Sequence, residues 1–396
     1  MHATGLLAQW LSQHTVIGHR AREAALMKLV EALLGGSKLT LTQLGRHRPG
    51  TAYTKHHIKA ADRLLGNHHL HAERDGIYRA IARTLLAGIK RPVILVDWSD
   101  ADLRRGLQMI KAAVAVGGRA ISLYERVHPV ELYNTPRAHR ELLAALKTML
   151  PDGCKPIIVT DAGFRGPWFK AVEAHGWDWV GRIRNRIQYY REETGRWQYT
   201  DALYRQATAR VRHIGKVRLS RRRGYCFRLY LVRAYRPRVG RPPLTRQQGG
   251  RVRPYRRLHR APWLLGTSLP HEKGSSQRIK QLYAQRMQIE ETFRDTKNPR
   301  WGFGLRYARC NDARRLEVLL LIAALASLVL WLVGVHGRTL DWARRAQANT
   351  ETRRPVLSTV FLGQQLLRRS DLKLSWLDFH RALAALQAMI LRVANL

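Results

Sequence analysis

Three carboxylates occupy positions from which they can bind a divalent cation. Asp97 and Asp161 each close a short apolar run, which is typical of a strand buried on both faces, and Glu290 lies in a predicted helix. Three such groups repel one another unless a cation lies among them, and hard oxygen ligands prefer Mg²⁺ or Mn²⁺. Two such ions activate a water or a 3′-hydroxyl and stabilise the leaving oxygen in phosphodiester transfer.

The elements around the two aspartates predict a sheet that brings them to one edge. The expected order is three strands, a helix, a strand, a helix and a strand, over residues 92–97, 108–116, 120–127, 136–150, 155–161, 167–175 and 177–183. This order is the one that a ribonuclease-H-like sheet requires. A right-handed crossover lays the second aspartate's strand parallel to the first, with both aspartates at the carboxyl ends.

The third acid lies in a pattern that predicts one helix of about twenty residues between Ser275 and Lys297. At about 100° per residue, four side chains share one direction: Tyr283, Arg286, Glu290 and Lys297. Glu291 and Asp295 turn toward solvent instead. A carboxylate aligned with cations is also typical of a salt-bridged surface, and the two strand-end aspartates favour a site. If the helical register were shifted by one residue, Glu291 would take the place of Glu290 beside these side chains.

Charge restricts the possible partners. The 396 residues carry 70 Lys and Arg against 28 Asp and Glu, a net charge of +42. Hydrophobic residues make up 45%, so real cores are expected and disorder of the whole chain is excluded. Such a field indicates a polyanion, DNA or RNA, and not a small metabolite. The three cysteines form no CxxC pair, which argues against a disulfide framework and fits a cytoplasmic protein.

Residues 318–335 are apolar apart from Ser327 and barely reach membrane-spanning length. A single late span is unusual in so basic a chain, so a buried core helix is favoured and no membrane partner is expected.

The chain divides into three predicted parts. Residues 1–85 read as a helical DNA-binding domain, with Lys55, Lys59 and Arg63 on the polar side of a second helix; an ordinary solvated helix pair is an equal alternative. Residues 86–335 form the α/β catalytic core, interrupted by a basic β-strand insertion over 186–264. Residues 336–396 are helical, and the helix over 372–396 serves dimerisation or core packing.

The insertion coincides with the most basic stretch of the chain. Residues 182–260 carry 24 Lys and Arg against three acids, half of the net charge. Interleaved aromatic residues favour a DNA cradle; the alternative is a disordered basic insertion. Residues 236–257 are rich in Pro and Gly and predict a mobile loop.

The motifs resemble bacterial DDE transposases of the insertion-sequence-four group. Residues 283–297, YAQRMQIEETFRDTK, match that group's Y-(2)-R-(3)-E-(6)-K signature, and VILVDWSD and VTDAGFR resemble the segments that hold its two aspartates. The similarity is closest to the branch that includes the Tn-ten element. It extends over most of the chain, through LTLTQLGR, RLLGNHHLH, TDAGF-x-x-PW, RMQIEETFRD and LSTV-x-LG.

This resemblance implies a function for each matched residue. Asp97, Asp161 and Glu290 become the catalytic triad on two Mg²⁺ ions, with Mn²⁺ as a substitute. Tyr283, Arg286 and Lys297 grip phosphates of the transposon end, and Trp263 matches a tryptophan that stacks on a flipped base.

The implied reaction is cut-and-paste transposition of double-stranded DNA by a homodimer, through strand cleavage, hairpin formation, hairpin opening and joining. Two alternatives stay open: a nuclease of the same fold that cuts without joining, and an inactive DNA-binding protein.

Overall fold

The computed structural model describes residues 3–14, 17–219, 224–233, 261–348, 350–351, 353–369 and 374–396. The chain divides into two compact units: the first joins residues 1–156 with 287–395, and the second holds residues 157–286. The predicted loop over 236–257 lies outside the described residues. The three-part division drawn from the sequence stays a prediction.

The first unit packs helices around a hairpin-rich sheet. Its five N-terminal helices are α1 (Ala3–His14), α2 (Arg20–Leu34), α3 (Leu41–Arg46), α4 (Thr54–Leu65) and α5 (His68–Leu85). Three antiparallel strands follow, in the order β3-β2-β1: β1 (Val93–Asp102), β2 (Leu107–Gly117) and β3 (Arg119–Pro129). The predicted hairpin between the last two is confirmed, and Gly117 and Gly118 both adopt positive φ at its turn.

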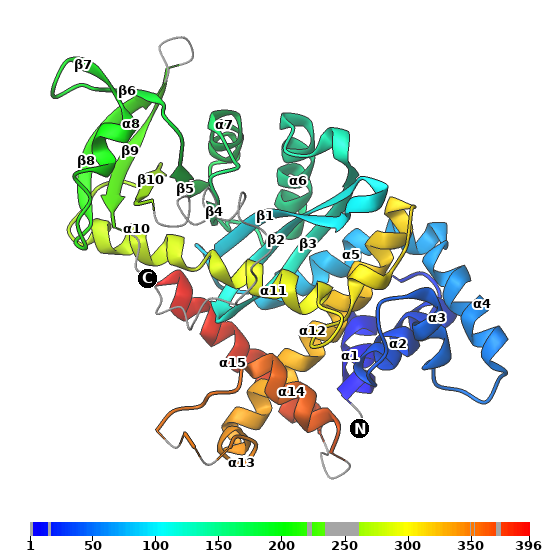
Figure 1. Cartoon of the computed structure of the whole chain (residues 1–396). Coiled ribbons are helices and arrows are strands. Elements are labelled where there is room, and N and C mark those ends of the chain that lie inside the picture. The colour runs from blue at the N-terminus through cyan, green and yellow to red at the C-terminus, as the bar shows by residue number, and fades with distance from the viewer. Residues whose placement is uncertain are drawn as a thin grey trace, which may run out of the picture. The chain divides into compact units, whose positions relative to one another are not determined.

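The remaining helices of the first unit either cover these strands or, as α13 and α14 do, pack on α12. They are α6 (Pro136–Met149), α11 (Met287–Lys297), α12 (Ala313–Thr339), α13 (Trp342–Arg345), α14 (Thr359–Leu367) and α15 (Trp376–Ala394), with short 3₁₀ turns at Leu103–Arg105, Val130–Leu132 and Leu305–Tyr307. Figure 1 shows α6 on one side of the strands and α11 and α12 on the other. The amphipathic face of α15 packs on α12, β1 and β2, so core packing is one role of the C-terminal helix.

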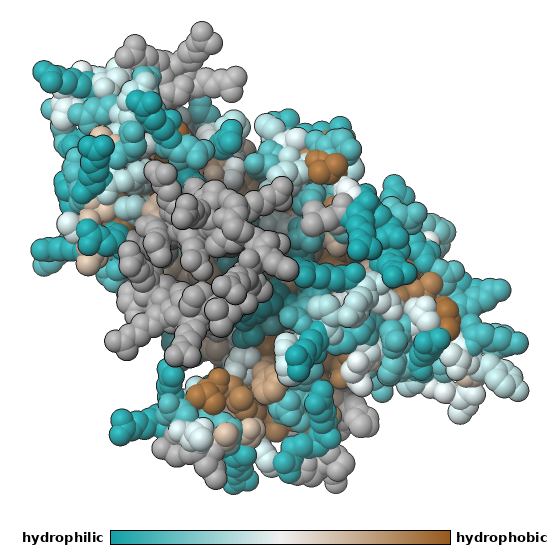
Figure 2. All heavy atoms as spheres, viewed as in Figure 1, coloured by the Kyte–Doolittle hydropathy of each residue, from teal (hydrophilic) through white to brown (hydrophobic). Residues whose placement is uncertain are grey.

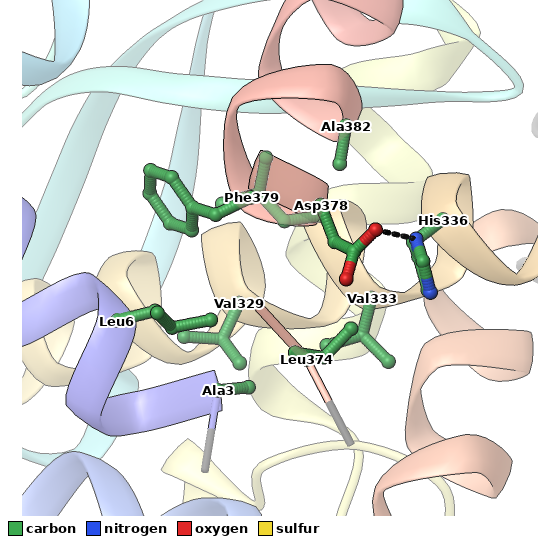
Figure 3. A pocket seen from close by; sticks show the side chains of 10 residues that line it. Ala3, Leu6, Val329, Val333, His336, Leu374, Asp378, Phe379 and Ala382 are labelled. Atoms are coloured by element: carbon green, nitrogen blue, oxygen red, sulfur yellow. Dashed lines mark ion pairs between the residues drawn. The ribbon is translucent and has the colours of Figure 1, made fainter. Parts of the chain in front are cut away.

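The apolar run over 318–335 lies in α12, whose most apolar window is long and hydrophobic enough to cross a membrane but is 94% buried inside the protein. This burial is typical of a core helix. A cavity of only about 10 Å³ lies between α1, α12 and α15, and is lined by Leu6, Val333, Leu374 and Phe379. Figure 3 shows the His336–Asp378 pair at its edge, with 3.9 Å between Nδ1 and Oδ1. These contacts fasten the C-terminal helix to the core.

The second unit is a twisted sheet in the order β4-β5-β10-β9-β8-β6-β7. Its strands are β4 (Ile157–Thr160), β5 (Asp178–Ile183), β6 (Gln188–Arg191), β7 (Arg196–Tyr199), β8 (Arg212–Leu219), β9 (Tyr225–Val232) and β10 (Trp263–Thr267). Its helices are α7 (Gly166–Ala174), α8 (Thr200–Tyr204) and α10 (Ser275–Ala284). β4 and β5 are parallel and joined through α7, and the other pairings are antiparallel. The predicted insertion thus contains ordered strands that extend the sheet beyond β10.

The single helix predicted over 275–297 is wrong, because the chain forms α10 and α11 with a break between them. At the break the amides of Gln285 and Arg286 bond to carbonyls three residues back, not four, which is the tighter 3₁₀ geometry. No Gly or Pro marks this point, so the apolar pattern runs through it unchanged. The prediction that four side chains point in one direction required a single continuous helix, so it does not hold across this break. The four side chains are those of Tyr283, Arg286, Glu290 and Lys297.

Candidate active site

Asp97 lies in the first unit, on the strand β1. The prediction that it ends its strand is wrong: burial falls after Val96, but pairing with β2 continues to Asp102. The Asp97 carboxylate is half-buried, and its Oδ1 accepts a hydrogen bond from the backbone N–H of Trp98 at 2.8 Å. This bond restricts the direction of the carboxylate.

Asp97 begins a row of charged residues that crosses the sheet. Lys111 lies directly opposite Asp97 on β2, and Glu125 lies opposite Lys111 on β3. Residues paired in this way share one face of a sheet. The Lys111 ammonium lies 4.9 Å from the centre of the Phe293 ring on α11, so the row, with Asp97, belongs to the face that α11 covers.

Trp98 points to the opposite face, where α6 holds it. Its indole Nε1 donates to Nε2 of His139 at 3.1 Å, and its ring lies against those of His128 and Tyr133. Burial, together with the nearby His128, lowers the pKa of His139 to about 4. The His139 ring is therefore neutral at pH 7, and its Nε2 can accept the hydrogen bond from Trp98. This bond restricts the orientation of Trp98, the residue next to Asp97.

The His139 contact predicts a loss of stability in acid. Below its ordinary pKa of 6.5 the unfolded chain binds a proton at His139, whereas the folded chain does so only near pH 4. From pH 6.5 to 4.5 this difference lowers the free energy of unfolding by about 2 kcal/mol. Urea denaturation at both pH values is expected to show a smaller acid loss in His139→Gln than in the wild type. Equal losses would contradict the assignment.

Glu290 lies in the first turn of α11, with an exposed carboxylate. Carboxylates are favourable at this end of a helix because of the helix dipole. The helix is anchored on the β2–β3 hairpin: Oε1 of Gln288 accepts from the amides of Val116 and Gly117 at 3.0 Å each, and Thr292 bonds both backbone groups of Ala120. These hydrogen bonds attach the helix that carries Glu290 to the strands β2 and β3.

Two acids near the site form ion pairs. Asp295, expected to face solvent, pairs with Arg119 on β3. Asp100 lies in β1 and binds the ammonium of Lys297, which also donates to Ser99. Lys297 is only 6% exposed, and burial lowers its pKa although Asp100 opposes the change.

Asp161 lies in the second unit, directly after β4, as predicted. Its Oδ1 accepts a hydrogen bond from the N–H of Gly163 at 2.8 Å. A Cβ at Gly163 would lie 3.0 Å from that same oxygen. A side chain at this position would therefore crowd the carboxylate, which would have to shift by a few tenths of an ångström.

The family resemblance implies that the Asp161 carboxylate binds a catalytic metal ion. On this expectation Gly163→Ala lowers DNA cleavage by about tenfold, because a displaced carboxylate loses its productive geometry. Gly166→Ala is the matched control, since a Cβ at this first residue of α7 meets nothing within 4 Å. Initial cleavage rates and unfolding midpoints of both variants test the point. Equal rates would show that Asp161 tolerates the added methyl group.

Tyr283 is the centre of a cationic cluster in the second unit. Its side chain is buried at the end of α10, and the Trp263 ring packs edge-on against it at 4.9 Å between centroids. Burial raises the pKa of Tyr283 and nearby Asp161 adds to the rise, whereas the charges of Arg286 and Arg182 oppose it. Two predicted DNA contacts, Tyr283 and Arg286, and the predicted stacking residue Trp263 therefore surround one point near Asp161.

Arg182 is a member of this cluster that the sequence prediction missed. It lies on β5, and its Nη2 donates to the carbonyl oxygens of Ala261 and Pro262 at 3.1 and 3.4 Å, next to Trp263. Its buried Nε has no hydrogen-bond partner among the described residues. The available signal was an arginine within the largely apolar run of β5, followed by Arg184 directly after the strand.

Lys55, Lys59 and Arg63 are exposed on α4, as the helical pattern predicts. The face shown in Figure 2 is largely hydrophilic around α3 and α4. Their contact with DNA stays a prediction.

A larger cavity, of about 390 Å³, lies in the first unit beside α11, α12 and α14. It is lined by residues that include Asp295, Trp301 and Trp331 and by none of the predicted site residues. Within each unit, over the described residues, no three His, Cys, Asp or Glu side chains gather as a metal site. The carboxylates predicted to bind metal are divided between the units, two in the first and one in the second.

Comparison with known families shows which protein family the chain matches. The family model described as the transposase DDE domain matches residues 88–327, more than half of the 396 residues. This match contains Asp97, Asp161 and Glu290. A search of curated proteins finds no match. The chain therefore belongs to the family of transposases with a DDE domain.

Proposed function

We propose that this chain is a cut-and-paste DNA transposase of the insertion-sequence-four group, closest to the Tn-ten branch. The observation that carries the proposal is the transposase DDE domain over residues 88–327, which includes all three predicted carboxylates. The Y-(2)-R-(3)-E-(6)-K signature of residues 283–297 supports the finer assignment.

Asp97, Asp161 and Glu290 are the proposed metal ligands. They supply only hard oxygen donors, which fits Mg²⁺, with Mn²⁺ as a substitute. When bound, two such ions activate the attacking oxygen and stabilise the leaving one. The chain's own contribution is orientation: the amides of Trp98 and Gly163 hold two carboxylates, and the α11 anchors hold the third.

The cluster around Tyr283 is the proposed phosphate grip. Arg286 and Arg182 bring positive charge beside the tyrosine hydroxyl, a combination suited to phosphate oxygens. Trp263 is the first residue of β10, and its ring is partly exposed. This ring is the proposed stacking platform for a flipped base. Arg182 extends the set that the family resemblance implies.

Basic surfaces elsewhere support binding to longer DNA. Arg218 of the strand insertion lies over the rings of Tyr190 and Trp197, at 5.0 and 5.5 Å. Such cation and aromatic layers suit a DNA backbone and its bases. In the first unit, the α4 residues Lys55, Lys59 and Arg63 are a separate proposed DNA contact. We also propose a homodimer that pairs two element ends in the bacterial cytoplasm, associated with the nucleoid.

The proposed reaction has four in-line phosphoryl transfers. Water hydrolyses one strand at the element end, and the freed 3′-hydroxyl attacks the opposite strand to form a hairpin. Water then opens the hairpin, and the 3′-hydroxyl attacks target DNA and joins the element to it. Each step exchanges one phosphodiester oxygen for another, so one set of ligands serves all four.

A labelled duplex that contains the element's own end, incubated with Mg²⁺ and target DNA, tests the proposal. Hairpin and joined products are expected from the wild type. Nicked DNA alone would favour the nuclease alternative. Tight binding without cutting in Mg²⁺ or Mn²⁺ would favour the inactive DNA-binding alternative and overturn the proposal.

A further inference from the structure

The ammonium of Lys297 is buried at the junction of α11 and β1. Its Nζ lies 2.7 Å from Oγ of Ser99 and 2.5 Å from Oδ1 of Asp100. The Phe293 ring covers it at 5.9 Å. An ammonium has three donors, and two of them are used by β1. The third donor is not used by β1, and Asp100 already neutralises the charge of the ammonium.

These contacts join the two elements that carry the metal ligands of the first unit. Ser99 follows Asp97 by two residues, so both side chains lie on one face of β1. Lys297 follows Glu290 by seven residues, or two helical turns, so both lie on one side of α11. The bond between Ser99 and Lys297 therefore links the Asp97 face of the strand to the Glu290 side of the helix.

We propose that Lys297 is a positioning residue, and that Ser99 and Asp100 clamp its ammonium to set the separation of Glu290 from Asp97. The inference rests on the proposed function of these two carboxylates as metal ligands. This role is additional to the phosphate contact that the family resemblance implies for Lys297. Asp100 becomes part of the site through Lys297 and without touching metal or DNA.

A double-mutant cycle on Lys297→Met and Asp100→Asn tests the clamp. Mn²⁺ affinity is measured without DNA, from the electron paramagnetic resonance signal of the free ion. Each single variant is expected to bind Mn²⁺ about tenfold more weakly, as is usual when support for a metal ligand is lost, and the double variant no more weakly than either. In the metal-free protein, the affinity of Asp100→Asn for the element end is expected to stay within about twofold of the wild type.

Asp102→Asn is the matched control, because Asp102 is on the same strand and pairs with Arg105 near the surface. Its Mn²⁺ affinity is expected to equal that of the wild type. Ser99→Ala removes one of the two clamp bonds and serves as a milder variant should the others fold poorly. Its Mn²⁺ affinity is expected to fall between those of the wild type and Asp100→Asn.

Three results would overturn the clamp. Unchanged Mn²⁺ affinity in both single variants would show that these contacts do not position the two carboxylates. Weaker Mn²⁺ binding in Asp100→Asn but not in Lys297→Met would make the aspartate a metal ligand. Additive shifts of the unfolding midpoint would show that the two side chains act independently. This last measurement needs neither metal nor DNA, so it decides the clamp even if the wild type shows no Mn²⁺ binding and no cleavage.

Discussion

Glu290→Gln is expected to abolish both cleavage and joining, with a loss of about a thousandfold or more. The amide keeps the size of the side chain but removes the negative charge on which metal binding depends. Asp97→Ala is expected to have the same result, because it removes the other proposed ligand of the first unit. Rates of hairpin formation and joining on labelled DNA measure the loss, and gel-shift affinity separates it from loss of DNA binding.

Glu291→Gln is the matched control for this experiment. Glu291 is the next residue of α11 and pairs with Arg294 instead of facing the Glu290 side. Its variant is expected to retain near-wild-type activity. Loss of activity in Glu291→Gln with retention in Glu290→Gln would move the catalytic assignment by one residue along the helix.

Glu125→Gln is expected to cause the largest loss of stability, about 3–5 kcal/mol. Glu125 and Lys111 form an ion pair at 2.7 Å with exposed side-chain fractions of 2% and 1%, and Tyr78 donates a further hydrogen bond to Glu125 at 3.0 Å. Removal of the negative charge leaves the buried Lys111 ammonium without its ion-pair partner. The charged row that begins at Asp97 thereby loses the ion pair between β2 and β3. Urea denaturation measures the change in the free energy of unfolding.

Two comparisons make this result specific. Glu141→Gln breaks an exposed pair with Arg137 and is expected to cost about 0.5 kcal/mol or less. The double variant Lys111→Met with Glu125→Leu is expected to recover much of the loss, because apolar residues of similar volume need no counter-ion. A small loss in Glu125→Gln would mean that water reaches the pair.

The sequence by itself determined most of the elements and predicted the chemistry. Apolar runs before Asp97 and Asp161 predicted β1 and β4, and Gly117 with Gly118 predicted the β2–β3 hairpin, because burial and turn conformation are local requirements. The signature spacing selected Glu290 among neighbouring acids as a metal ligand, and this role stays a prediction. These predictions depend on residues close together in the chain.

Only the tertiary structure decided which partners these residues meet. Lys297 binds Ser99 and Asp100, which precede it by almost two hundred residues, and Arg182 of the strand β5 lies beside Tyr283 of the helix α10. The break between α10 and α11 has no local mark, and β1 extends past Asp97 because β2 supplies hydrogen bonds up to Asp102. Contacts between distant segments follow from the packing of whole elements, which no local pattern of residue types contains.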